Sequence, residues 1–278
     1  MSPILPLGVA LRAWQSSASL LFRSAIWLPF LLMAGIQALA LGLLLGFHHD
    51  LLLPVGAPLV EMLAGREAMH YPVLYLALPM MFAKVNLGIN VLVASLASGV
   101  ATVLFARAFG SANVGSAWRA AFRSWPVLIV LAALSIALVL GVSYLTSLVP
   151  EETRSGSRGV RWGVRALSLL LFVLVQSMLA YTTAWVVLRG QSIWPALRDS
   201  VRVAFRTFLP TFIVVGIPAL LLYPFSYAVG RVEWIASKFR PEMVSALIGV
   251  QLFFELVATF VVVGAITRLF LWRMGAAR

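Results

Sequence analysis

Residues 194–229, WPALRDSVRVAFRTFLPTFIVVGIPALLLYPFSYAV, decide the fold class of this chain. Arg198, Arg202 and Arg206 recur every four residues and so share one side of a helix. Large apolar residues occupy the other side: Trp194, Leu197, Val201, Phe205 and Phe208. From residue 209 an apolar run without a charged residue follows, and about 20 such residues cross the ~30 Å hydrocarbon core of a membrane. The stretch predicts a helix that lies flat in the membrane interface, followed by a helix that spans the membrane.

The same order of features occurs three times along the chain. Each copy has a short basic amphipathic stretch that ends in Phe-Arg-Ser or Phe-Arg-Thr, then a proline and an apolar run. The copies are Phe22-Arg23-Ser24 with Pro29, Phe122-Arg123-Ser124 with Pro126, and Phe205-Arg206-Thr207 with Pro210. Such self-similarity predicts three repeats of an amphipathic helix and a membrane hairpin, over residues 1–108, 109–188 and 189–278. We expect each proline to mark the bend into the span, because proline disfavours continuation of a helix through it.

The composition places the chain in the membrane class. Of its 278 residues, 62% are apolar and 11% are charged, whereas charged residues approach about a quarter of a soluble protein. Six windows are apolar and long enough to span: residues 25–47, 85–108, 126–149, 164–188, 209–229 and 245–269. Residues 71–83 form a shorter apolar run, broken by Pro79, which favours an interfacial or re-entrant segment. We therefore predict an all-α, polytopic integral membrane bundle with six transmembrane helices, in a single domain over residues 1–278.

The distribution of charge predicts the orientation. When the segments between the windows are assigned alternately to two sides, 12 arginines fall on the side of both termini and 9 lysines and arginines on the other. The positive-inside rule then favours cytoplasmic termini. The net charge of +12 comes from basic residues in the segments that flank the predicted spans, so it is explained by membrane orientation and we expect no nucleic-acid partner. Residues 38–40, Ala-Leu-Ala, resemble a signal-peptidase site, but the apolar run continues past them, which favours an uncleaved span.

The amphipathic stretches supply the first candidate site. Their arginines would form a cationic surface in the interface: Arg12, Arg23, Arg119, Arg123, Arg198, Arg202 and Arg206. Arginine grips phosphate bidentately, so one interpretation is a platform for anionic membrane lipids or for a membrane-protein partner complex. The other interpretation is anchoring, because arginine at a cytoplasmic boundary helps to fix the orientation of a span. Both interpretations stay open.

Polar residues inside the predicted spans supply the second candidate site. Glu255 is the one acidic residue within a span, and Gln251 lies one turn before it on the same face. Gln37 and Gln176 lie at similar depth in the first and fourth spans. Smaller polar groups in the second span are Ser95 and Ser98. A carboxylate at this depth is costly unless paired or neutralised, so one interpretation is a converging site with Glu255 as ion ligand, proton carrier or substrate anchor. The other is structural hydrogen bonding between helices.

Motifs for catalysis or metal binding are absent from the sequence. It contains no phosphate-cradling glycine loop, no GxSxG elbow and no HExxH. It contains no cysteine, which excludes disulfides and thiolate metal sites. His48, His49 and Asp50 are consecutive, whereas zinc ligands are spaced, so we expect a solvated helix end without a metal there. We also expect no cofactor, and a polar outer loop over residues 151–165.

The order of basic amphipathic helix, hairpin and Phe-Arg-Ser/Thr before a proline-entered span resembles a group of six-span bacterial membrane proteins. That group includes the membrane domain fused to some glycerophosphoryl diester phosphodiesterases. The resemblance covers the chain by layout and implies an accessory protein of the bacterial inner membrane, with no catalytic residue carried over. We therefore expect a non-enzymatic membrane component that binds lipid or a partner complex. The alternative is a transporter or channel-like protein that uses the polar site around Glu255.

Overall fold

The computed structural model describes residues 6–110, 115–148 and 158–275, and within these ranges the chain forms helices and no β-strand. Six of these helices are long and apolar enough to cross a membrane: Ser24–Gly46, Val73–Ala108, Ala117–Thr146, Trp162–Arg189, Phe208–Val229 and Met243–Arg273. The predicted all-α class with six spans is confirmed. The division into three repeats stays a prediction.

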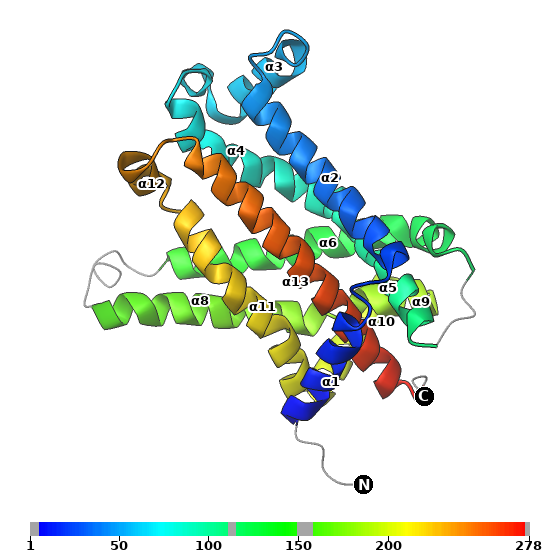
Figure 1. Ribbon diagram of the computed structural model, residues 1–278. Helices are drawn as coiled ribbons and strands as arrows, with labels where there is room; N and C mark the ends of the chain where they lie inside the picture. The colour runs from blue at the N-terminus through cyan, green and yellow to red at the C-terminus, as the bar shows by residue number, and fades with distance from the viewer. Residues whose placement is uncertain (1–5, 111–114, 149–157, 276–278) are drawn as a thin grey trace.

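The spans form two groups that meet at one end of the molecule and diverge toward the other (Figure 1). The first group comprises α2 (Ser24–Gly46), α4 (Val73–Ile89), α11 (Phe208–Val229) and α13 (Met243–Arg273). The second is the hairpin of α6 (Ala117–Ser147) and α8 (Arg158–Leu179). Where the groups meet lie α1 (Pro6–Ala18), α5 (Ser95–Ala108), α9 (Thr182–Arg189) and α10 (Ile193–Arg206). We call this the basic end, because α1, α10 and the start of α6 carry the predicted cationic surface, and we call the opposite end the far end.

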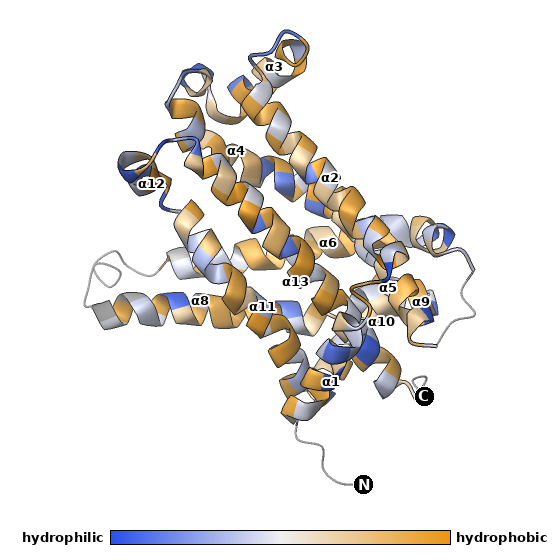
Figure 2. Ribbon diagram, in the orientation of Figure 1, coloured by the Kyte–Doolittle hydropathy of each residue, from blue (hydrophilic) through white to orange (hydrophobic). Residues whose placement is uncertain are grey.

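Short helices cover the far end of the first group. They are α3 (Leu53–Ala64), the 3-10 helix Arg66–Met69 and α12 (Val232–Lys238). Figure 2 shows apolar residues along most of α2 and α11, with hydrophilic residues gathered around α12. This is the distribution expected when the middle of each span faces hydrocarbon and the connections face water.

The second span is longer than the sequence predicted. Helix α4 (Val73–Ile89) continues through a π-helical turn, Asn90–Ala94, directly into α5. The expectation of a separate interfacial or re-entrant segment over residues 71–83 is therefore wrong. Pro79 lies inside α4, and the helix persists through it because one face is buried: Leu78 and Met81 are fully covered in a core cluster shared with α2 and α13. Proline is tolerated inside membrane helices when neighbouring groups compensate for the lost hydrogen bond.

The three amphipathic stretches join their spans in different ways. α1 and α10 are separate helices, whereas the second stretch forms the first part of α6, which continues through Pro126. The expected bends at Pro29 and Pro126 are wrong, since Pro29 lies inside α2 and the chain turns earlier, at residues 19–23. Of the three prolines, Pro210 alone follows a break closely, because Thr207 separates α10 from α11. Proline within the first turn of a helix removes no hydrogen bond, which suits that position.

The predicted outer loop is shorter than expected. Residues 151–157, including Glu151, Glu152 and Arg154, lie outside the described residues, as do Val114 of the second amphipathic stretch and Arg278. However, α8 begins at Arg158, so the prediction of a loop through residue 165 is wrong. The guanidinium of Arg165 lies 5.6 Å from the centre of the Trp162 ring one turn earlier, and such i,i+3 contacts favour the helical conformation.

Candidate functional site

Helix α10 has a buried side and an exposed side, and these orient it at the basic end. Small residues, including Ala196 and Ser200, are buried against the rest of the protein. On the exposed side, Trp194 and Phe205 are 79% and 62% exposed. The arginines share this side, since Arg198 follows Trp194 by four residues. A helix that exposes aromatic and basic residues in this way is typical of one that lies in a membrane interface.

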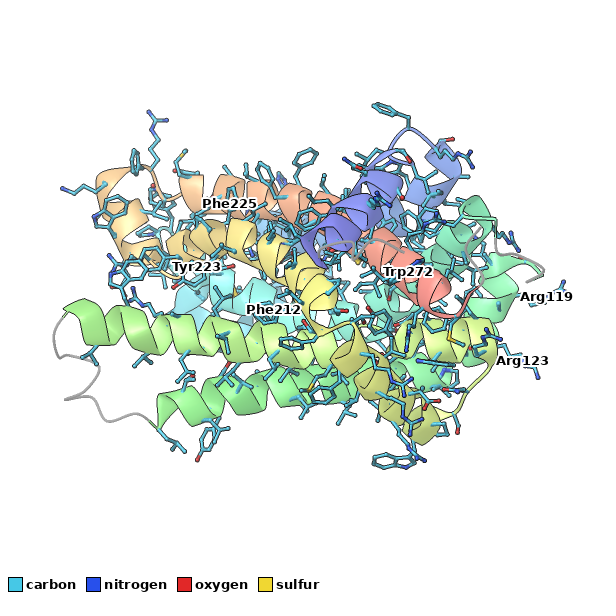
Figure 3. The ribbon with its side chains drawn as sticks, turned by 90° about the horizontal axis from the view of Figure 1, so that it is seen from below. Arg119, Arg123, Phe212, Tyr223, Phe225 and Trp272 are labelled. Carbon is cyan, nitrogen blue, oxygen red and sulfur yellow. The ribbon has the colours of Figure 1, made fainter. Side chains whose placement is uncertain are left out.

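All the arginines predicted to form the cationic surface are exposed: Arg12, Arg23, Arg119, Arg123, Arg198, Arg202 and Arg206. Figure 3 shows Arg119 and Arg123 pointing away from the ribbon at the end of the molecule where Trp272 lies. Within the described part of the chain, Arg202 alone among the seven has a carboxylate within 4 Å, that of Asp199 at 3.4 Å. The structure therefore places these side chains at one end, where six of the seven have no counter-ion among the described residues.

A groove of about 310 Å³ lies between α1 and the last turns of α13. It is lined by Arg12, Gln15 and Ser16 of α1, and by Arg268 and Trp272 of α13. The Arg268 guanidinium lies 5.1 Å from the centre of the Phe109 ring, a cation–π contact that orients it. None of the described acidic residues lines the groove. It is a cationic pocket at the basic end, and we call it the arginine groove.

The intramembrane polar residues form separate pairs rather than one converging site. The Gln37 side-chain amide donates to Asn86 Oδ1 at 2.8 Å, which joins α2 to α4. The Gln251 amide donates to Glu255 Oε1 at 3.5 Å, within α13. No lysine or arginine in the described ranges lies within 4 Å of the Glu255 carboxyl group. The structure thus confirms that Gln251 and Glu255 share a face, but it gives Gln37 a different partner.

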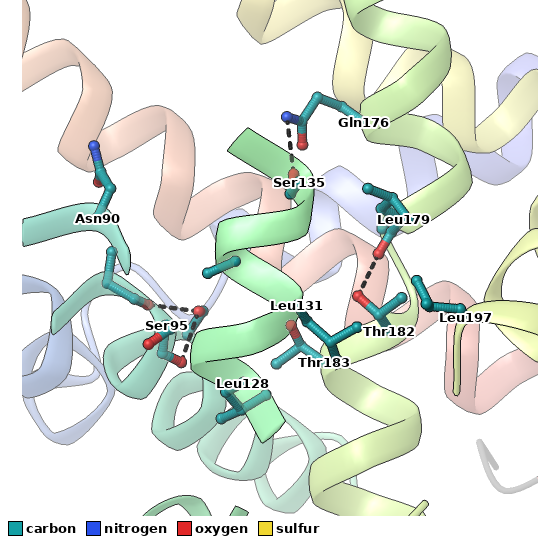
Figure 4. Close-up of a pocket in the computed structure, with 14 residues that line it drawn as sticks. Asn90, Ser95, Leu128, Leu131, Ser135, Gln176, Leu179, Thr182, Thr183 and Leu197 are labelled. Carbon is teal, nitrogen blue, oxygen red and sulfur yellow. Dashed lines mark hydrogen bonds between the residues drawn. The ribbon is translucent and has the colours of Figure 1, made fainter. Parts of the chain in front are cut away.

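Gln176 belongs to a third polar group, which lines a cavity of about 260 Å³ between α5, α6 and the α8–α9 connection (Figure 4). Its side-chain amide donates to Ser135 Oγ of α6 at 3.4 Å. Further polar groups on the wall are Asn90, Ser95, Ser98, Thr182 and Thr183. A neighbouring cavity of about 130 Å³, which reaches α11 and α13, shares Ser98 and Gln176 with the first. We call the two together the polar cavity.

The polar cavity offers hydrogen bonds but no charge. Its described lining contains amides, hydroxyls and apolar side chains, and Glu255 is not part of it. Ser95 and Ser98 donate to carbonyl groups of their own helix, as hydroxyls in membrane helices commonly do. An uncharged polar wall at membrane depth suits neutral hydrogen-bonding groups and disfavours a bare ion.

Three residues that line the arginine groove or the polar cavity were not predicted from the sequence. Arg268 completes the arginine groove. It lies near the C-terminal end of the chain, far in sequence from Arg12, and the packing of α1 on α13 brings the two arginines to one groove. Asn90 and Ser135 line the polar cavity from two different spans. Their signal was present, since both are polar residues within apolar runs, but the sequence does not show which face of each helix turns inward.

Comparison with known proteins gave no match to a protein-family model, to a curated protein or to a solved structure. In the described part of the chain, no group of three or more histidine and acidic side chains is arranged to hold a metal ion. The candidate functional sites are thus the arginine groove, the exposed arginines around it and the polar cavity.

Proposed function

We propose that this chain is a non-enzymatic integral membrane component that binds anionic phospholipid at its basic end, with the arginine groove as the seat of the headgroup. The observation that carries the proposal is the convergence of Arg12 and Arg268 on one groove without a described carboxylate. Two unpaired guanidinium groups attract an anion, and their planar forks match phosphate oxygens. The exposed aromatic residues of α10 and the indole of Trp272 support the proposal, because tryptophan is enriched at the level of lipid headgroups.

The surrounding arginines support the same proposal less specifically. Exposed basic residues near an anionic leaflet contribute about 1 kcal/mol each to membrane attraction. The same surface suits a membrane-protein partner complex with an acidic face. With the positive-inside count and the resemblance in layout, we place the chain in a bacterial inner membrane with both termini in the cytoplasm.

Charge removal in the arginine groove tests this proposal. We expect Arg12→Gln/Arg268→Gln to weaken binding of phosphatidylglycerol at least tenfold, because charge-assisted hydrogen bonds to phosphate contribute about 1.5–3 kcal/mol each. Native mass spectrometry of the detergent-solubilised protein, titrated with phosphatidylglycerol or phosphatidylcholine, measures the affinity. The same spectra of gently extracted protein report any stoichiometric protein partner.

The matched control for the groove is Arg119→Gln/Arg123→Gln, which removes the same charge from the same end outside the groove. We expect this control to lower the affinity no more than about threefold, since exposed charges are screened. Equal losses in the two variants would contradict a defined headgroup seat. Equal binding of phosphatidylcholine by the unaltered protein would contradict selectivity for anionic lipid.

A second candidate function, transport, is favoured by the polar cavity, because polar groups inside a membrane commonly mark a path for substrate or ions. Under this proposal the uncharged wall of the polar cavity takes a neutral polar substrate, and Glu255, which lies in α13 outside the cavity, carries the coupling proton or cation. We expect the unaltered chain in proteoliposomes to pass protons or sodium under an imposed gradient, and Glu255→Gln to abolish the flux while the thermal midpoint stays within a few degrees. Glu242→Gln, in the connection before α13, is the control. Absence of flux in the unaltered chain would remove this candidate for both ions.

A further inference from the structure

Two arginines at the far end share one tyrosine ring. The guanidinium carbon of Arg165, in α8, lies 5.2 Å from the centre of the Tyr227 ring in the last turn of α11. That of Arg231, just before α12, lies 4.7 Å from the same centre. Because both distances end at one point, the two guanidinium carbons lie within about 10 Å of each other. Residues of α8, α11 and the connection before α12 thus bring two positive charges close together.

Aromatic side chains complete this cluster. The ring of Tyr223 stacks on that of Tyr227, with centres 6.3 Å apart, and Trp162 lies beneath Arg165. Figure 3 shows Tyr223 on the side of α11 that looks toward the α6–α8 hairpin. Tyrosine and tryptophan are enriched where a span leaves the hydrocarbon, so the cluster marks the boundary of the membrane at the far end.

The two guanidinium groups have no acidic counterpart in the described residues. Neither Arg165 nor Arg231 has a carboxylate within 4 Å of its guanidinium group in the described ranges, and neither guanidinium group donates a hydrogen bond there. Arg165 is half-buried and Arg231 is exposed, and each guanidinium offers five N–H donors. The ring of Tyr227 orients both cations but does not neutralise them. Two like charges this close repel each other, and an anion bound between them would attract both and offset the repulsion.

We propose that Arg165, Tyr227 and Arg231 form a phosphate-binding site at the far end, on the opposite side of the membrane from the arginine groove. Guanidinium groups recognise phosphate through paired, parallel hydrogen bonds, and a phosphate between two of them receives donors from both sides. The position at the membrane boundary allows the phosphate to belong to a phospholipid headgroup or to a free phosphate in the adjacent water. This inference is independent of the proposed function, because no residue of the arginine groove takes part.

The experiment uses the Arg12→Gln/Arg268→Gln chain as its background, so that lipid bound in the arginine groove does not obscure the far end. Native mass spectrometry in detergent measures the binding of dioleoylphosphatidylglycerol, with dioleoylglycerol as the same lipid without phosphate. We expect one phospholipid to stay bound and dioleoylglycerol to bind at least tenfold more weakly. Adding Arg165→Gln/Arg231→Gln should weaken phospholipid binding at least tenfold.

Two further variants keep the result interpretable. Lys238→Gln/Arg240→Gln removes the same charge from the same end outside the cluster, and we expect it to change binding less than threefold. Arg231→Gln alone alters an exposed side chain between helices, so the fold is retained, and we expect a loss of at least threefold. Inorganic phosphate at about 10 mM, ten times a Kd of about 1 mM, distinguishes the source of the phosphate. Displacement of the lipid identifies a site for free phosphate, and retention identifies a lipid site. Binding unchanged in Arg165→Gln/Arg231→Gln, or equally weakened in the control, would overturn the proposal.

Discussion

Gly264→Ala is expected to destabilise the protein by about 1–3 kcal/mol, the usual cost of overpacking a well-packed interface. Gly264 lies in α13 beneath α1, and a Cβ atom there would come within 2.1 Å of Ser17 Oγ and 2.7 Å of the Phe105 ring. Ser17 and Phe105 are both fully buried, and the Phe105 ring packs edge-on against Phe260 with centres 5.0 Å apart, so neither has free space to move into. The midpoint of unfolding in a detergent denaturant titration measures the effect.

Gly249→Ala is the matched control for this prediction. Gly249 lies in the same helix, and a Cβ atom there has no heavy atom within 4 Å. We expect this substitution to be neutral or stabilising by up to about 1 kcal/mol, because alanine favours helix over glycine. Adding Ser17→Ala to Gly264→Ala should recover part of the loss. A Gly264→Ala chain as stable as the unaltered protein would show that α1 does not pack closely on α13, and would contradict an arginine groove formed between these two helices.

Tyr181→Phe is expected to cost about 0.5–1.5 kcal/mol, because it removes buried hydrogen bonds, while the hydroxyls of Thr207 and Thr211 keep each other as partners at 3.2 Å. Tyr181 is fully buried in the turn between α8 and α9, and its hydroxyl lies 2.6 Å from Thr211 Oγ1 and 3.1 Å from Thr207 Oγ1. Thr207 Oγ1 in turn donates to the carbonyl of Val203 at 2.8 Å. The backbone N–H of Tyr181 donates to Ser200 Oγ at 3.2 Å. This network ties the hairpin to α10 and α11.

A double-mutant cycle isolates the contribution of the hydrogen bonds. Tyr181→Phe and Thr211→Val remove the two ends of the shortest bond, so the double variant should lose clearly less than the two single losses added together. Tyr71→Phe, at an exposed tyrosine, should change the unfolding free energy by less than about 0.5 kcal/mol. Additive losses in the cycle would mean that the Tyr181 hydroxyl does not couple to Thr211.

The sequence predicted the spans well, because crossing hydrocarbon imposes a length and a composition that show directly in the residues. It failed at residues 71–83, where Pro79 suggested a break. Whether a proline ends a helix depends on what covers it, and burial of Leu78 and Met81 against other spans cannot be read from neighbouring residues. The same reason explains the helix through Pro126.

The candidate sites show the same division between local and tertiary information. The exposed face of Arg198, Arg202 and Arg206 follows from helical spacing and was predicted correctly. The partner of Arg12, which is Arg268, depends on which helices touch, and helical spacing carries no information about that. Likewise the depth of Gln37, Gln176 and Gln251 was predicted from position within each span, but their hydrogen-bond partners required the rotation of each helix about its axis.

The π-helical turn at Asn90–Ala94 has a consequence for how this chain tolerates change in length. A π turn accommodates one residue more than an α turn, so it rotates everything that follows by about 100° relative to an uninterrupted α-helix. Asn86, ahead of the turn, faces α2, while Ser95 and Ser98, after it, face the polar cavity. Loss of a single residue between them would convert the turn to regular helix and swing both serines away from Gln176. Single-residue deletions in this segment are therefore expected to be more damaging than substitutions. The number of residues from Asn86 to Ser98 sets the rotation of the second half of this span relative to the first half.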